Sequence, residues 1–317
     1  MNVFGETEKI AVQDKHLVVA LGNFDGVHRA HQRLLREMTA YAQKIGALST
    51  VFLFHPHPQQ VLNPNKCPKL LLDTNKKIEL LEQQGVDVIF TIPFDVKFAS
   101  LAPEEFVDKI ASELKVAGVF VGYDYRFGCA AQGTPELLKE LGEKKGFYVE
   151  VIPPVVFKET PISSTLIRKA LSAGSISRAK ELLGYWPVLK GEIITGEKRG
   201  RKLGFPTANI RIPGELLVPQ NGVYVGEALL QKKHYLTVLN IGVHPTFGSS
   251  SQELIEAHLL DFQGDAYHEE IEIKLLKWLR EERKFKSAHD LIKQIRNDIK
   301  AAEKIYGEIE EHRLYTG

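Results

Sequence analysis

The sequence has few of the features that mark secreted, zinc-binding or membrane proteins. Its 317 residues include two cysteines, Cys67 and Cys129, which form no C-x-x-C pair and lie beside no histidine cluster, so neither a structural zinc site nor a disulfide is implied. No run approaches the roughly 20 apolar residues of a membrane span, and the polar stretch 1–15 lacks the apolar core of a signal peptide. The 41 basic and 40 acidic side chains leave a formal net charge of +1, which gives no general reason to expect binding to nucleic acid or membranes. We expect a cytoplasmic protein, a monomer or weak homo-oligomer.

The order of the apolar runs predicts two parts of different character. The hydrophobic content of 44% and charged content of 26% are those of a globular protein, long enough for one large or two ordinary domains. In the first part, strand-length runs alternate with helical segments, the last of them predicted over 171–186 and ended by Gly184, which indicates a mostly parallel sheet covered on both faces. The second part has short β-rich runs, then a helical segment at 291–305. We expect its apolar stripe to pack on the strands, with a partner interface as the alternative; the stripe consists of Leu291, Ile295, Ile299, Ala302 and Ile305. The predicted domains are 1–186 and 187–317.

The most informative stretch is GNFDGVHRAHQ at 22–32. It follows a short apolar run and precedes a segment of helical periodicity, and a strand, tight turn and helix in this order present free backbone N–H groups to an anion. Gly22 and Gly26 permit close approach of the backbone, while His28 and His31 would lean over the same phosphates. Two histidines at this spacing are by themselves more often a solvated helix start, but the whole string favours nucleotide chemistry.

Three further stretches of the first part lie where a ligand is expected. His57 belongs to an H-P-H-P string after a buried strand, at the strand end where open α/β sheets bind ligands, although a rigid turn would also explain it. The loop 122–133 also follows a strand and carries Asp124 and Arg126 among glycines and aromatics. The string PISSTLIR at 161–168 is a capped helix start whose serines and arginine are poised for a triphosphate.

The second part contains one glycine-rich basic stretch, GEKRGRKLGFPTAN at 196–209. Such charge runs are usually solvated loops, but glycines among basic residues also suit a flap that folds over phosphates, and the string is no Walker loop. Further on, Glu256 lies in an alternating strand on the face opposite Ile255 and Ala257, so alternation alone makes it a solvent-facing residue.

These strings resemble two enzyme motif sets. The stretch 22–32 resembles the G-x-F-D-G-x-H-x-G-H motif of nucleotidyltransferases in the form carried by bacterial FAD synthetases, with Ala30 where that motif usually has glycine. The loops 122–133 and 161–168 resemble the G-x-D-x-R-F-G and I-S-S-T-x-I-R motifs of the same enzymes, and 196–209 resembles the G-x-x-x-G-R-x-L-G-F-P-T-A-N motif of riboflavin kinases. The resemblance implies an α/β nucleotidyltransferase domain (Rossmann-like, with a parallel sheet), followed by a small antiparallel β-barrel riboflavin kinase domain with a C-terminal helix.

For the first part the resemblance implies an FMN adenylyltransferase in which His28, His31 and Arg168 stabilise the developing charge. The ATP-binding residues would be Gly22, Phe24, Asp25, Gly26, His28, His31, Ser163, Ser164 and Arg168. The flavin-binding residues would be His57, Asp124, Arg126 and Phe127.

For the second part the resemblance implies a kinase in which Glu256 is the general base that takes the proton of the ribityl 5′-hydroxyl, a role worth roughly 10²–10⁴ in rate. Asp261 and Asp265 are lower-ranked alternatives in or beside a turn. Thr207 and Asn209 would coordinate Mg²⁺. The ATP-binding residues would be Gly196, Lys198, Gly200, Gly204, Thr207 and Asn209, and the flavin-binding residues Glu256 and Arg280.

We therefore predict a flavoprotein enzyme that converts riboflavin to FMN and FMN to FAD with ATP, with riboflavin, FMN, FAD, ATP, ADP and pyrophosphate as its ligands. One alternative is an enzyme active only as a kinase, because Ala30 weakens the first site. The other is a protein that senses or stores flavin without ATP turnover.

Overall fold

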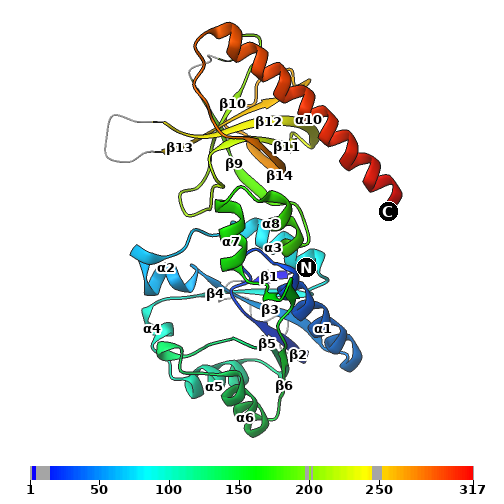
Figure 1. Cartoon of the computed structure of the whole chain (residues 1–317). Helices are drawn as coiled ribbons and strands as arrows, with labels where there is room; N and C mark the ends of the chain where they lie inside the picture. The colour runs from blue at the N-terminus through cyan, green and yellow to red at the C-terminus, as the bar shows by residue number, and fades with distance from the viewer. Residues whose placement is uncertain (1, 5–14, 197–199, 201–202, 245–251, 317) are drawn as a thin grey trace. The chain divides into compact units, whose positions relative to one another are not determined.

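The computed structural model describes residues 2–4, 15–196, 200, 203–244 and 252–316. The chain forms two compact units, residues 1–164 and 165–317 (Figure 1).

The first unit is built on a six-stranded parallel sheet with the strand order β1-β4-β3-β2-β5-β6. The strands are β1 (Asn2–Phe4), β2 (Leu17–Leu21), β3 (Leu48–His55), β4 (Val88–Pro93), β5 (Val116–Gly122) and β6 (Tyr148–Ile152). From β2 the chain continues outward to β3 and β4, then returns to place β5 on the other side of β2. Beyond the carboxyl ends of β2 and β5 lies the switch point where open α/β sheets bind ligands.

Helices cover both faces of this sheet, and every residue of β2 is buried. The helices of the unit are α1 (Arg29–Ile45), α2 (Pro58–Leu62), α3 (Thr74–Gln83), α4 (Val96–Ala99), α5 (Pro103–Glu113) and α6 (Pro135–Lys145), with 3-10 turns at Pro64–Lys66 and Cys129–Ala131 and a small hairpin of β7 (Val156–Phe157) and β8 (Thr160–Pro161). Leu17, Val19 and Leu21 share an apolar cluster with side chains of α5 and α6, whereas Tyr41 of α1 packs over Gly118 beside Val18. The alternating strand positions thus explain why β2 reads as a continuous apolar run.

The second unit is a closed antiparallel barrel with the strand order β10-β13-β12-β11-β14-β9. Its strands are β9 (Val188–Ile194), β10 (Ala208–Arg211), β11 (Gly222–Leu230), β12 (Lys233–His244), β13 (Gln252–Leu259) and β14 (Glu270–Arg280). Its helices are α7 (Ser164–Ser172), α8 (Ile176–Leu183) and the C-terminal α10 (Ala288–Thr316).

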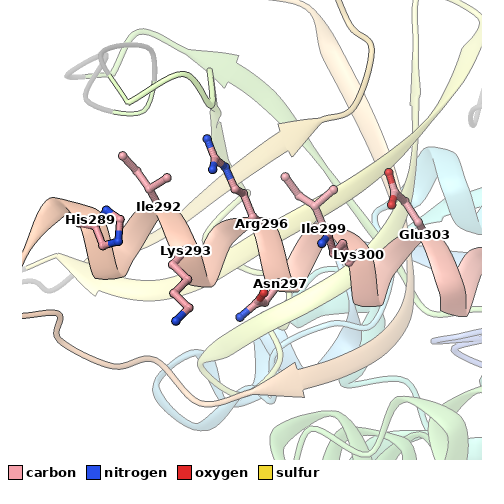
Figure 2. A pocket seen from close by; sticks show the side chains of 8 residues that line it. All are labelled: His289, Ile292, Lys293, Arg296, Asn297, Ile299, Lys300 and Glu303. Atoms are coloured by element: carbon pink, nitrogen blue, oxygen red, sulfur yellow. The ribbon is translucent and has the colours of Figure 1, made fainter.

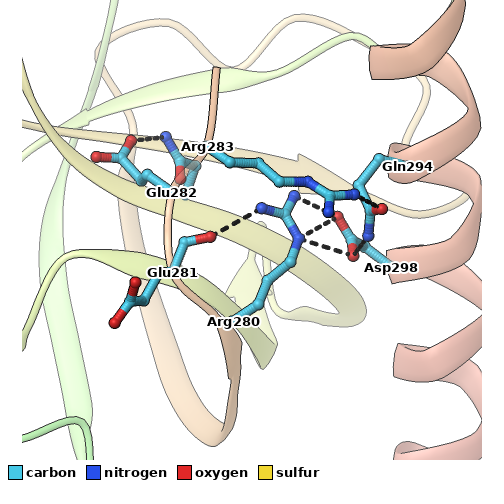
Figure 3. A network of polar contacts seen from close by, with 7 residues as sticks. Arg280, Glu281, Glu282, Arg283, Gln294 and Asp298 are labelled. Atoms are coloured by element: carbon cyan, nitrogen blue, oxygen red, sulfur yellow. Dashed lines mark hydrogen bonds and ion pairs between the residues drawn. The ribbon is translucent and has the colours of Figure 1, made fainter. Parts of the chain in front are cut away.

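Helix α10 packs on the outside of the barrel through an apolar cluster and an ion pair. Ala302 is fully buried against Val225 and Leu276, with Ile305 beside them. Arg280, the last residue of β14, donates to the carboxylate of Asp298 on α10 (Figure 3). The predicted packing of the helix on the strands is confirmed.

The predicted fold class is confirmed in both units, and one helix prediction needs correction. The single helix expected over 171–186 is two helices, α7 and α8, because the chain turns at Gly174, whose φ of +66° is a conformation that glycine adopts without steric cost. Gly184 does end α8, with a left-handed φ of 85°.

Candidate active sites

The first candidate site lies at the switch point of the parallel sheet. The loop that begins at Gly22 follows β2, the loop that begins at Tyr123 follows β5, and His57 follows β3. Since these three strands are neighbours and parallel, the predicted nucleotide and flavin segments meet at one edge of the sheet.

The loop between β2 and α1 has a strained backbone. Phe24, Gly26 and Val27 have φ values of 47°, 83° and 33°, and such angles are uncommon for non-glycine residues, above all for β-branched ones. Strain of this kind costs on the order of 1–3 kcal/mol per residue and clusters at functional sites. Ala30 lies in the first turn of α1 and has no positive φ, so its methyl group causes no backbone strain.

Asp25 anchors this loop from inside the protein. Its carboxylate is 2% exposed and accepts a hydrogen bond from the backbone N–H of Leu71 at 3.0 Å. Its carbonyl oxygen accepts one from the hydroxyl of Ser164 at 2.8 Å. Two residues predicted to bind ATP therefore also join the loop to distant parts of the unit.

Two more side chains hold the loop by its carbonyl oxygens. Gln32 donates to the carbonyl of Val27 at 2.8 Å, and Lys77 of α3 donates to the carbonyl of Asn23 at 3.2 Å. Lys77 is only 5% exposed, and sequence reasoning missed it. The available signal was its position three and four residues before Leu80 and Leu81, on the apolar face of α3.

His28 and His31 lie together at the N-terminus of α1. Their rings stack at 3.6 Å, and Nδ1 of His28 accepts the backbone N–H of His31 at a long 3.5 Å, so the proton of a neutral His28 lies on Nε2. The ring of Phe24 lies 5.2 Å from that of His31. Burial lowers the pKa of His31 well below 6.5, and the charges of His28 and Lys77 lower it further, so His31 is neutral at pH 7.

The predicted flavin residues divide into anchored and surface groups. Phe127 belongs to the core, and its backbone pairs with Gly133, so it shapes the loop after β5. His57 is also buried and caps α2 by accepting a backbone N–H. Arg126 donates to the carbonyl of the preceding residue, and it lies with Asp124 at the exposed part of the loop.

The second candidate site is a row of polar side chains across three barrel strands. Glu256 of β13 pairs with Asn209 of β10 on one side and with Asn240 of β12 on the other. Directly paired residues project to the same side of a sheet, so these three side chains share one face. Ile255 and Ala257 are buried on the opposite face, which confirms the predicted alternation around Glu256.

Glycines of the basic stretch lie against the predicted metal-binding residues. A Cβ added at Gly196 would overlap the side-chain amide of Asn209, and one at Gly200 would overlap the Phe205 carbonyl and lie 3.1 Å from the hydroxyl of Thr207. Gly204 turns the chain with a φ of 86°. Lys198, the remaining predicted residue of this stretch, lies outside the described residues.

His258, which sequence reasoning missed, holds the same segment. Its Nδ1 lies 2.8 Å from the carbonyl oxygen of Pro206, and because a carbonyl only accepts, Nδ1 carries the proton. The ring of Phe205 meets the imidazole edge-on at 5.7 Å. His258 follows Glu256 by two residues on β13, so one strand places the carboxylate and fixes the approach to Thr207.

Arg280, which is predicted to bind flavin, also has a structural partner. Its guanidinium makes 3.1 and 2.7 Å bonds to Asp298, which also accepts a bond from Gln294 (Figure 3). The neighbouring Glu282 accepts a bond from Asn240 of the polar row at 2.7 Å. The end of β14 is thereby tied to both α10 and the second candidate site.

One cavity lies along an outward face of α10 (Figure 2), and none of the predicted site residues lines it. Its lining residues are His289, Ile292, Lys293, Arg296, Asn297, Ile299, Lys300 and Glu303. Ile299 therefore faces this cavity, unlike Ala302 and Ile305 of the same predicted apolar stripe.

Arg168 lies on α7, which clusters with the second unit, so its role toward the first site remains a prediction. Ser163 directly precedes that helix. No helix in the part of the chain that the structure describes is long and apolar enough to span a membrane.

The first unit has a strained strand–turn–helix loop with two histidines. The second unit is a barrel in which glycines lie beside a row of polar side chains that includes a carboxylate. These features define a protein that handles nucleotides at two sites. The comparisons with known proteins agree with this class. The family model for FAD synthetase matches residues 10–166, and that for riboflavin kinase matches residues 183–306.

Two curated relatives match along almost their full length. A bifunctional riboflavin kinase/FMN adenylyltransferase of Listeria monocytogenes is 36% identical over 94% of this chain and 95% of its own, and one of Bacillus subtilis is 38% identical over 89% and 90%. A solved structure from Streptococcus pneumoniae, titled a macrolide-efflux protein, matches with a TM-score of 0.87 and 29% identity over 96% of this chain and 99% of its own. The chain belongs to the family of bifunctional riboflavin kinase/FMN adenylyltransferases, and the predicted enzyme class is confirmed.

Proposed function

We propose that the barrel transfers the γ-phosphoryl group of ATP to the 5′-hydroxyl of riboflavin, and that the parallel-sheet domain joins the resulting FMN to the adenylyl group of ATP. The products are FMN and ADP in the first reaction, and FAD and pyrophosphate in the second. The proposed division between the two activities is at residues 186 and 187.

The observation that carries the kinase proposal is the register that sets Asn209 and Asn240 on either side of Glu256. Glu256 takes the proton from the 5′-hydroxyl as its oxygen attacks the γ-phosphorus, and ADP leaves. His258 positions the segment that ends in Thr207 by holding the Pro206 carbonyl. Gly196 and Gly200 lie against Asn209 and Thr207, so the backbone at these glycines has room to approach the phosphates closely.

Magnesium fits the side-chain oxygens of Thr207 and Asn209. Among the described residues no group of three or more histidine, cysteine, aspartate or glutamate side chains could hold a metal ion. Mg²⁺ does not need such a cage, because it usually binds through few protein oxygens together with substrate phosphates. Thr207 and Asn209 would supply a hydroxyl and an amide oxygen, and bound Mg²⁺ would neutralise phosphate charge.

In the adenylyltransferase, an FMN phosphate oxygen attacks the α-phosphorus of ATP and pyrophosphate leaves. The backbone N–H groups at the start of α1 and the side chains of His28, His31 and Arg168 stabilise the negative charge on the leaving group. Because His31 is neutral, it donates a hydrogen bond to phosphate and brings no positive charge of its own. Asp124 and Arg126 bind the ribityl chain or phosphate of FMN.

We also propose that the chain works in the cytoplasm, as a monomer or weak homo-oligomer, without a nucleic-acid or membrane partner. The near-neutral charge balance supports this proposal.

A time course with riboflavin, ATP and Mg²⁺, followed by chromatography of the flavins, tests the two activities. The wild-type protein should form FMN first and FAD later. Glu256→Gln should lower FMN formation about 10²- to 10⁴-fold, whereas FAD formation from supplied FMN should not change.

Asp261→Asn is the matched control, because Asp261 lies in the turn after β13 and is the alternative base. It should keep the kinase rate within about twofold. Loss in this variant with retention in Glu256→Gln would assign the base to Asp261. Formation of FMN without FAD by the wild-type chain would show that the chain is active only as a kinase. Tight flavin binding without any product would show that it senses or stores flavin without ATP turnover.

A further inference from the structure

Lys77 is a buried lysine beside the nucleotide loop for which the proposed mechanism has no use. Its residue exposure is 5%, and in the described part of the chain its ammonium makes one hydrogen bond, to the carbonyl of Asn23 at 3.2 Å. An ammonium has three N–H donors, and an underused buried charge is costly unless it serves the site around it.

Three charged or titratable groups interact electrostatically with this ammonium. Burial, the largest influence, lowers the pKa of Lys77, whereas Asp25 and Asp73 favour its charged form. In return, the charge of Lys77 is felt at His31, after burial and the stacked His28. Lys77 therefore interacts with both the anchored Asp25 and a histidine of the predicted phosphate site.

The hydrogen bond of Lys77 falls on the residue directly before the strained turn. Asn23 precedes Phe24, the first residue with a positive φ, and the turn ends at Val27. Neutral donors at Gln32, Ser164 and the Leu71 backbone also hold this loop. Lys77 adds a charged donor to these contacts, which together hold the loop in its unfavourable conformation.

We propose that Lys77 is a positioning residue for adenylyl transfer: by holding the carbonyl of Asn23, its ammonium fixes the turn from Asn23 to Val27. The fixed turn presents the backbone N–H groups at the helix N-terminus to the leaving group as negative charge accumulates on it. This inference rests on the proposed adenylyltransferase function and adds a residue to it.

The test compares Lys77→Met, Lys77→Gln and Lys77→Arg with the wild-type chain, using FMN and ATP for FAD formation and riboflavin for the kinase. Lys77→Met should lower kcat for FAD formation at least tenfold, while the kinase, measured on the same sample, stays within twofold. Lys77→Arg, which keeps the charge and the donors, should recover part of the loss. Lys144→Met, at an exposed lysine in the last turn of α6, is the matched control and should change neither activity.

The pH profile separates positioning from support of the fold. Lys77 is the smallest of the three influences that lower the pKa of His31, after burial and His28, so the acid limb of kcat for FAD formation should move slightly to higher pH in both Lys77→Met and Lys77→Gln, while burial keeps the pKa of His31 below 6.5. Lys77→Gln keeps a hydrogen-bond donor for Asn23 and decides the case if Lys77→Met fails to fold. Wild-type kcat and an unmoved acid limb in Lys77→Gln would overturn the proposal, whereas absence of FAD formation by the wild-type chain would instead overturn the proposed function.

Discussion

Removing the carboxylate of Asp298 should loosen the C-terminal helix from the barrel by a predictable amount. Asp298 accepts 3.1 and 2.7 Å bonds from Arg280 and a 2.7 Å bond from Gln294. Its side chain is 7% exposed and that of Arg280 is 22% exposed. Removing one partner of a fully buried pair costs about 3–5 kcal/mol, and exposed pairs contribute about 0–1 kcal/mol. For this partly exposed pair we expect Asp298→Ala to lower the free energy of unfolding by about 2–3 kcal/mol, between those limits.

Tryptophan fluorescence during urea denaturation measures this loss of stability in the second unit of the chain. The chain has two tryptophans, Trp186 and Trp278, and both belong to the second unit, so their signal reports that unit within the intact chain. The matched control is Glu308→Ala, which removes an exposed i,i+4 partner of Lys304 at 4.0 Å. It should cost less than about 0.5 kcal/mol.

A double-mutant cycle isolates the interaction from the loss of the side chains themselves. Arg280→Met combined with Asp298→Leu should be more stable than the sum of the single changes by about 1–2 kcal/mol, within the range for residues in direct contact. Additive effects of the two changes, or an Asp298→Ala midpoint equal to that of the wild-type chain, would refute the idea that this pair fastens α10.

Two further predictions concern the two sites. Gly196→Ala should displace the amide of Asn209, because a Cβ at this position overlaps that amide. It should lower the kinase rate at least tenfold while FAD formation from supplied FMN is retained. A wild-type kinase rate in this variant would contradict the contact. His31 should make the first unit less stable as the pH falls below 6.5, because the unfolded state then binds a proton that the native state, with its lowered pKa, does not bind. Hydrogen exchange of the β2 amides at pH 7.5 and 5.5 should show this dependence, and it should be smaller in His31→Gln.

The strand and helix pattern was predictable because local sequence and tertiary burial agree along most of the chain. The continuous apolar run of β2 indicates a strand that is covered on both faces, as in a parallel sheet between helices. The alternation around Glu256 indicates a strand that is covered on one face, as in the barrel. The break at Gly174 was missed, although the buried positions change phase there: Leu171 and Ile176 lie five residues apart, a spacing that the face of one continuous helix does not have.

The partners of the predicted residues were less accessible to sequence reasoning. Arg280 was predicted to bind flavin through the family resemblance, but its bonds to Asp298 depend on how a distant helix docks. Phe127 was predicted to bind flavin, and its side chain belongs to the core cluster with residues of α5 and β5 while its backbone pairs with Gly133. A motif identifies which residues matter, whereas packing determines whether each one touches a ligand or holds another residue.

The nucleotide loop shows why its motif depends on the rest of its unit. The turn from Phe24 to Val27 holds unfavourable φ angles that a short peptide of this sequence would relax. The contacts that hold it come from Leu71, Lys77 and Ser164, which follow Asp25 or Asn23 by 46, 54 and 139 residues. The geometry of the loop therefore depends on contacts from Leu71, Lys77 and Ser164, so the capacity to bind phosphate depends on the rest of the unit.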